Sequence, residues 1–154
     1  MSFIKAQSKP IAIGCDHAGV DFKNEIINFL NQNGVQVDDC GCYDENSVDY
    51  PDIAQAVCKK ITDKDCDKGI LICGTGIGIS ISANKLNGIR AALCHDYFSA
   101  KYTRLHNDSN VICFGARVIG TGLALELVDV FLSTEFEGGR HQARVDKLMN
   151  LQGK

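Results

Sequence analysis

The sequence has no apolar run that approaches the roughly 20 residues needed to cross a lipid bilayer, and we expect no membrane-spanning segment. Its N-terminal segment is largely polar and contains no apolar stretch of signal-peptide length. A strong charge of one sign is also lacking, because the 154 residues carry 16 basic and 19 acidic side chains and a net charge of -3. Since nucleic-acid binding depends on concentrated positive charge, we expect neither nucleic acid nor membrane as a partner.

Cysteine is abundant, yet its eight copies form no zinc or redox motif. Cys40 and Cys42 are the closest pair, and they lack the Cys-x-x-Cys spacing typical of such sites. Because the sequence shows no secretion signal, we expect reduced thiols, a cytoplasmic location and no metal site.

Short apolar segments alternate with segments of helical period along the chain. The expected strands are 11–15, 35–40, 69–73, 90–94 and 110–114. The expected helices lie near 18–33, 52–64, 77–87, 97–106 and 120–133. Right-handed β-α-β connections then predict an α/β, Rossmann-like fold, with one five-stranded parallel sheet, helices on both faces and the flavodoxin-type strand order 2-1-3-4-5.

The chain length fits a single domain over residues 1–154. This arrangement leaves over a basic, amphipathic helix near 140–151. That helix must pack either on its own domain or on a second subunit.

The strongest functional signal lies between Gly69 and Ser80, where an apolar strand ends at Cys73 and passes into a glycine-rich turn before a helix. Glycines let backbone amides approach an anion closely, and a helix N-terminus favours thiolate over thiol. A free core cysteine is the alternative. In the predicted strand order, Asp16 and His17 face the same crevice and add groups for proton transfer. A solvated Asp-His turn explains that pair equally well.

A dinucleotide site is a second interpretation of the glycine turn, with Asp96 as the acid that binds ribose. The spacing argues against it, because Gly74, Gly76 and Gly78 form Gly-x-Gly-x-Gly and Ile79 stands where the third glycine of the fingerprint belongs. No Gly-Lys-Ser/Thr follows the turn, so a P-loop is excluded as well.

Two further groups of residues suit phosphate binding and proton transfer. Arg140 and Arg144 lie on one face of the last expected helix near its start, and two guanidinium groups suit a phosphoryl group. A solvated basic face paired with Glu137 or Asp146 is the alternative. His106 lies in a polar corner before the fifth strand, where an imidazole either moves protons or caps the helix.

Several motifs, in their order and spacing, together resemble type B ribose-5-phosphate isomerase over nearly the whole chain. They are Gly14-Cys15-Asp16-His17, Ser47-Val48-Asp49-Tyr50-Pro51-Asp52, Cys73-Gly74-Thr75-Gly76-Ile77-Gly78, Ala83-Asn84-Lys85, His106-Asn107-Asp108 and Gly138-Gly139-Arg140-His141. The wider family includes allose-6-phosphate and galactose-6-phosphate isomerases.

The resemblance implies an intramolecular oxidoreductase of the non-oxidative pentose phosphate pathway. It would interconvert ribose 5-phosphate and ribulose 5-phosphate through a cis-enediol, without metal or organic cofactor. By resemblance, Cys73 is the base that moves a proton between C2 and C1, Thr75 and the amides of residues 74–78 hold the enediolate oxygen, and His106 opens the furanose ring. The implied substrate-binding residues are Asp16, His17, Tyr50, Gly74, Gly76, Gly78, Asn107, Arg117, Arg140 and Arg144.

The resemblance also implies a homodimer, or a tetramer, whose sites combine residues of two subunits, with the last helix at the dimer interface. Some members of the family use a glutamate at the end of the glycine turn as the base. Ile79 occupies that position here, which assigns this chain to the thiol-using branch. Three alternatives stay open: a six-carbon sugar-phosphate isomerase, a non-catalytic sugar-phosphate sensor and a dinucleotide-dependent oxidoreductase.

Overall fold

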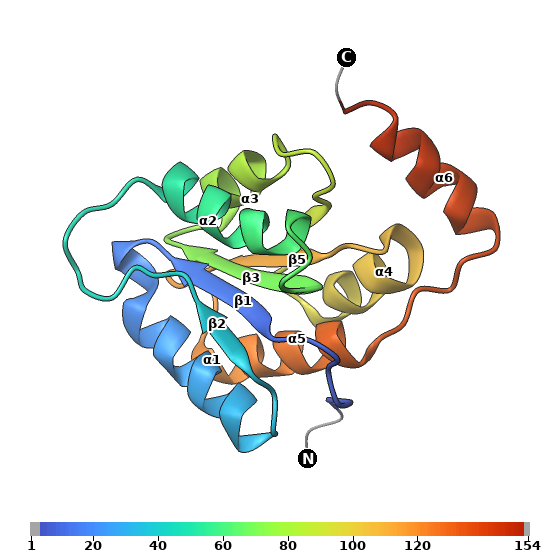
Figure 1. The fold of residues 1–154 in the computed structure, drawn as a ribbon. Coiled ribbons are helices and arrows are strands. Elements are labelled where there is room, and N and C mark those ends of the chain that lie inside the picture. The colour runs from blue at the N-terminus through green and yellow to red at the C-terminus, as the bar shows by residue number, and fades with distance from the viewer. Residues whose placement is uncertain (1–3, 153–154) are drawn as a thin grey trace.

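The computed structural model describes residues 4–152, and its centre is a five-stranded parallel sheet (Figure 1). The strands lie in the order β2-β1-β3-β5-β4. Their bounds are β1 Ile11–Cys15, β2 Val37–Asp39, β3 Lys68–Cys73, β4 Ala91–Leu93 and β5 Val111–Gly115. Each coincides with a predicted strand to within a few residues, and the parallel α/β architecture is confirmed.

The predicted flavodoxin-type order is wrong at one edge of the sheet, where β5 lies between β3 and β4. All residues of β5 are buried, whereas those of β4 are half-buried or exposed. A central parallel strand is covered on both faces and needs a continuous apolar sequence. The Val-Ile-Cys-Phe run of β5 provides one, so the shorter Ala-Ala-Leu strand takes the edge.

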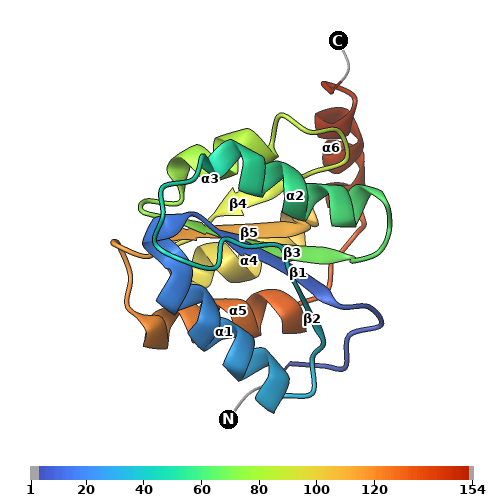
Figure 2. The same cartoon turned by 60° about the vertical axis from the view of Figure 1, so that its left-hand side comes forward.

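Two layers of helices cover the sheet (Figure 2). One face carries α1 (Val20–Gln32), α4 (Tyr97–Asn107) and α5 (Thr121–Ser133), and the other carries α2 (Tyr50–Thr62) and α3 (Ile77–Ala83). Side chains alternate along each strand, so Ile70 and Ile72 pack in the core beneath the first layer, while Leu71 and Cys73 pack beneath the second. The Cys73 side chain therefore lies on the face where α3 begins.

The last helix, α6 (Arg140–Met149), stands beside these layers rather than within them (Figure 1). It follows Gly138 and Gly139, whose φ angles of 65° and 55° turn the chain, and it packs against the end of α4. The predicted C-terminal helix is thus confirmed, and Leu148 on it is 43% exposed. Among residues 4–152, neither α6 nor any other helix has the length and apolar character that crossing a membrane requires.

Candidate active site

Cys73 ends β3 and differs from the other thiols in its hydrogen bonding. Its Sγ accepts a hydrogen bond from the backbone N–H of Gly76 at 3.0 Å. Cys15, Cys40 and Cys42 instead donate to backbone carbonyl oxygens. Because a donor directed at sulfur stabilises the thiolate, Cys73 is the thiol best placed to take up a proton.

Burial keeps several other cysteines protonated. Desolvation raises the pKa of Cys15, Cys58 and Cys94 to about 12, and it raises the pKa of Cys113 well above the usual value. All eight cysteines are free. These four buried thiols are therefore structural at neutral pH.

The turn after Cys73 needs glycine for both conformation and space. Gly76 has a φ of 77°, and a Cβ at this position would lie 2.7 Å from the backbone carbonyl carbon of Phe114. A Cβ on Gly115 would lie 2.6 Å from the backbone carbonyl carbon of Thr75. The end of β5 therefore packs directly on the turn, which holds its amide groups in place.

Two side chains lie over this turn. Tyr50 covers Gly78, since a Cβ there would meet the Tyr50 Cζ at 2.6 Å. Arg117 covers Gly74, with Nη1 3.4 Å from the corresponding position. Both side chains therefore flank the turn that follows Cys73.

The end of β1 adds Asp16 and His17, as the sequence predicts for neighbouring strands. The Asp16 amide donates to the Ile72 carbonyl at 3.0 Å, and the Asp16 carboxylate accepts from the Ala18 amide at 2.9 Å. Nδ1 of His17 accepts from the Val48 amide at 3.4 Å, so a neutral ring carries its proton on Nε2 as a donor. The first half-site, as we define it, comprises Asp16, His17, Tyr50, Cys73, the turn 74–78 and Arg117.

Other predicted site residues surround the end of α4. His106 stacks on His141 of α6, with ring centroids 4.1 Å apart and an interplanar angle of 13°. Burial, together with the charges of His106 and Arg140, lowers the pKa of His141. A cavity of about 230 Å³ opens here, lined by His106, Asn107, His141, Arg144, Val145 and Leu148. We call His106, Asn107, Arg140 and Arg144 the second half-site.

The two half-sites lie at opposite ends of the parallel strands, the first at their C-terminal ends and the second near the N-terminal end of β5. In the pairing of β3 with β5, Val111 is opposite Gly69 and Gly115 is opposite Cys73. His106 precedes Val111 in the chain, so the strand from Val111 to Gly115, about 13 Å at roughly 3.3 Å per residue, separates the two levels. Within one chain, His106 therefore does not reach a sugar placed at Cys73.

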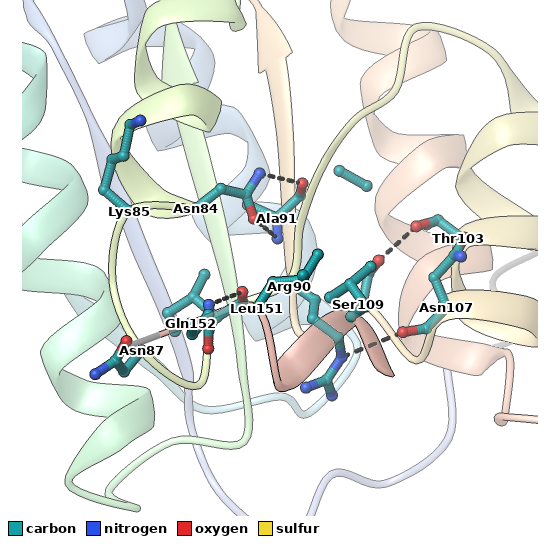
Figure 3. Close-up of a pocket in the computed structure, with 13 residues that line it drawn as sticks. Asn84, Lys85, Asn87, Arg90, Ala91, Thr103, Asn107, Ser109, Leu151 and Gln152 are labelled. Carbon is teal, nitrogen blue, oxygen red and sulfur yellow. Dashed lines mark hydrogen bonds between the residues drawn. The ribbon is translucent and has the colours of Figure 1, made fainter. Parts of the chain in front are cut away.

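A larger cavity of about 720 Å³ lies between α6, α4 and the segment that joins α3 to β4 (Figure 3). Arg90 crosses it, but its guanidinium donates to the carbonyl oxygens of Asn107 and Asp108. The Asn84 side chain pairs with both the N–H and the C=O of Ala91. These polar groups join elements of the fold, and the cavity meets the second half-site at Asn107.

The sequence suggests Glu137 only as a possible ion-pair partner of Arg140 and Arg144, and it gives His141 no role beyond the motif that contains it. In the structure, a carboxylate oxygen of Glu137 lies 3.4 Å from Nε2 of His141 and 4.0 Å from Nε2 of His106. The only sign of this cluster in the sequence is a second histidine beside Arg140. The sequence does not show that His141 contacts His106 and Glu137, because that contact depends on how α6 packs against α4.

Comparisons with known proteins, by sequence and by structure, all match the chain to sugar isomerases. Residues 11–148 match the family model described as Ribose/Galactose Isomerase. The chain is 48% identical to ribose-5-phosphate isomerase B of Escherichia coli, over 94% of this chain and 97% of that protein. It is 50% identical to D-erythrulose-4-phosphate isomerase of Pectobacterium atrosepticum, over 90% and 91% respectively. The structure of ribose-5-phosphate isomerase B from Clostridium thermocellum matches with a TM-score of 0.91 and 48% identity, over 92% and 96%.

Proposed function

Because this chain belongs to the ribose/galactose isomerase family and is a sugar-phosphate isomerase, we propose that it interconverts ribose 5-phosphate and ribulose 5-phosphate. The observation that carries the proposed chemistry is the Gly76 amide directed at the Cys73 sulfur, at the start of a turn held in place by β5. It places a sulfur that accepts a backbone N–H next to further backbone donors. Enolisation needs both a base and an oxyanion site.

In the aldose-to-ketose direction, the Cys73 thiolate removes the proton from C2. The electrons of the C2–H bond form the C1–C2 double bond of a cis-enediol, and the aldehyde oxygen becomes an enediolate oxygen held by Thr75 and the amides of the turn. Cys73 then returns the proton to C1, while a second proton passes from O2 to O1. Substrate and product are isomers, so the step consumes no cofactor.

Ring opening and phosphate binding use the second half-site, which we assign to a partner copy of the chain. His106 acts as the acid and base that opens the furanose ring, and Asn107 and Asp16 bind sugar oxygens. Tyr50 lines the sugar pocket. The phosphate is held by groups from both half-sites: Arg140, Arg144, His17 and Arg117.

An exposed apolar edge supports a homodimer that joins the half-sites. Large apolar side chains that are 39–66% exposed gather along β4, α3 and the start of α4, namely Ile77, Ile81, Leu93, Tyr97 and Phe98. We call this set the β4–α4 edge. Helix α4 begins at the end of the strands where the first half-site lies, and it finishes at the opposite end, beside the second half-site. A two-fold axis that passes the middle of α4 would therefore place the first half-site of each copy next to the second half-site of the other copy. A tetramer would pair two such dimers.

We also place the enzyme in the cytoplasm. All eight cysteines are free, and several lie near one another in the core. Such thiols persist in a reducing compartment.

The test is the initial rate of ketose formation by purified protein in a buffer containing a chelator, with Cys73→Ala as the control. Ribose 5-phosphate, allose 6-phosphate and erythrose 4-phosphate, the aldose isomer of erythrulose 4-phosphate, are compared, because one relative is named D-erythrulose-4-phosphate isomerase. Fastest turnover of ribose 5-phosphate supports the proposal. Faster turnover of another sugar phosphate would reassign the substrate, and no turnover of any would favour a sugar-phosphate sensor.

A further inference from the structure

We propose that His106, Glu137 and His141 form a binding site for a divalent transition-metal ion of the Zn²⁺ type, and that an ion bound there inhibits the isomerase. The metal site stands on its own geometry. Its inhibitory effect rests on the proposed function, in which His106 opens the sugar ring.

The ligand atoms are already close to the spacing that zinc requires. One atom from each of the three side chains lies within 4.8 Å of the others. A tetrahedral ion with bonds of about 2.1 Å sets its ligand atoms about 3.4 Å apart. His141 Nε2 and Glu137 Oε2 are 3.4 Å apart, and the 4.0 Å between His106 Nε2 and the same oxygen is slightly wider. The two rings are stacked at an interplanar angle of 13°, so their Nε2 lone pairs point in nearly parallel directions. An ion therefore binds once the His106 ring turns out of the stack and the Glu137 side chain turns with it.

The backbone around the three residues holds the set together before any ion binds. The Glu137 amide donates to the Leu105 carbonyl at 3.1 Å, which ties the segment before α6 to the last turn of α4. His141 is 5% exposed, so its ring position is fixed by packing. The Glu137 side chain is 51% exposed and is able to swing toward an ion.

The chemistry of the set selects the kind of ion. Two imidazoles and one carboxylate bind zinc in many enzymes and leave a fourth position for water or another ligand. Imidazole nitrogen suits zinc and similar transition metals, whereas magnesium and calcium prefer oxygen ligands. Arg140 and Arg144 lie nearby and add positive charge, which lowers the affinity for a free cation.

A bound ion would occupy the Nε2 lone pair that His106 needs for proton transfer. Inhibition should therefore act on ring opening rather than on enolisation at Cys73. Ribulose 5-phosphate has no furanose form, because its C5 oxygen carries the phosphate. We expect Zn²⁺ to lower the rate from ribose 5-phosphate at least tenfold and the reverse rate from ribulose 5-phosphate much less.

The binding test is calorimetric titration of tag-free protein with zinc chloride, for the wild type, Glu137→Gln, His141→Gln and Glu135→Gln. Glu135 is an exposed glutamate two residues away and is the matched control. We expect the wild type and Glu135→Gln to bind one ion per chain, and the other two variants to bind it at least tenfold more weakly. The absorption spectrum of the Co²⁺ form should show nitrogen and oxygen ligands without a thiolate band. Equal affinity in all four proteins, or a thiolate band, would overturn the proposal.

The activity test measures inhibition by zinc in both directions, relative to each protein's own rate in chelator. Zinc inhibition in the wild type and Glu135→Gln, relieved by chelator and absent in Glu137→Gln, supports the proposal. Zinc bound at this site without inhibition would overturn the inhibitory role. If the metal-free wild type fails to isomerise any of the three sugar phosphates while zinc binding is lost in Glu137→Gln, the proposed function fails and the metal site stands.

Discussion

At the scale of single residues, the backbone around a thiol decides its chemistry. Cys113 and Cys73 lie on neighbouring strands and both pack beneath α2 and α3. Burial raises the pKa of Cys113 far above its usual value, whereas the Cys73 sulfur receives the Gly76 amide. Two cysteines in one core cluster therefore have different surroundings, because only Cys73 stands at the end of its strand.

Cys73→Ala is expected to lower kcat/KM for ribose 5-phosphate about 10³-fold, because a general base contributes on the order of 10²–10⁴. The phosphate ligands do not include Cys73, so competitive inhibition by inorganic phosphate should stay within about twofold of the wild type. Steady-state kinetics measure both values. Cys58→Ala is the control and should retain most of the activity. A Cys73→Ala enzyme with near-normal turnover would disprove the assignment of the base.

Residues at strand ends were predictable, and residues brought together by helix packing were not. Asp16 and His17 follow one apolar strand that the sequence identifies and Cys73 ends another, and the paired β1 and β3 bring them together. The stack of His106 on His141 involves α6, whose position depends on its contact with α4. Sequence periodicity predicts that such a helix exists but not where it packs.

At the scale of elements, the edge strand β4 explains both the error in strand order and the short α3. Helix α3 ends at Ala83 rather than at the predicted residue 87. The Asn84 side chain leaves the helix direction and pairs with the backbone N–H and C=O of Ala91, both at 2.8 Å. It takes the place of a neighbouring strand for β4, whose outer edge pairs with no strand among residues 4–152.

Asn84→Ala is expected to destabilise the protein by roughly 1–2 kcal/mol, because two hydrogen bonds to the Ala91 backbone are lost. Thermal unfolding should show a decrease in Tm of several degrees, since about 1 kcal/mol corresponds to 2–4 °C in a domain of this size. Asn87→Ala, at an exposed asparagine in the next turn, is the control and should leave Tm nearly unchanged. Equal Tm values for the two variants would show that the Asn84 pairing does not stabilise β4.

At the scale of the whole molecule, the two proposed half-sites of one chain lie too far apart to act on the same sugar. The first half-site lies where β1, β3 and β5 end, and the second lies at the end of α4. The sequence motifs predicted the members of both groups by resemblance. The strand register shows that the two groups are separated, whereas the order of motifs in the sequence does not say at which end of the strands a residue lies.

Phe98→Ser is expected to weaken the dimer and the activity together, because Phe98 is 66% exposed in the single chain and lies on the β4–α4 edge. Sedimentation analysis should show a shift toward monomer, and the rate at low protein concentration should fall at least about tenfold, since burial of such a side chain contributes roughly 1.5–3 kcal/mol per copy. Tyr43→Ser, at an exposed aromatic residue near β2, is the control and should remain dimeric. A fully active monomeric Phe98→Ser protein would rule out shared sites.

The most direct measurement of the central claim is the activity of a mixture of Cys73→Ala and His106→Asn proteins, refolded together at equal concentration. Each variant alone should be nearly inactive. If a site combines Cys73 of one copy with His106 of the other, each mixed dimer contains one intact site, and statistical mixing restores about a quarter of the wild-type rate. Because a site built within one chain would be broken in every mixed dimer, a mixture as inactive as its components would contradict the account.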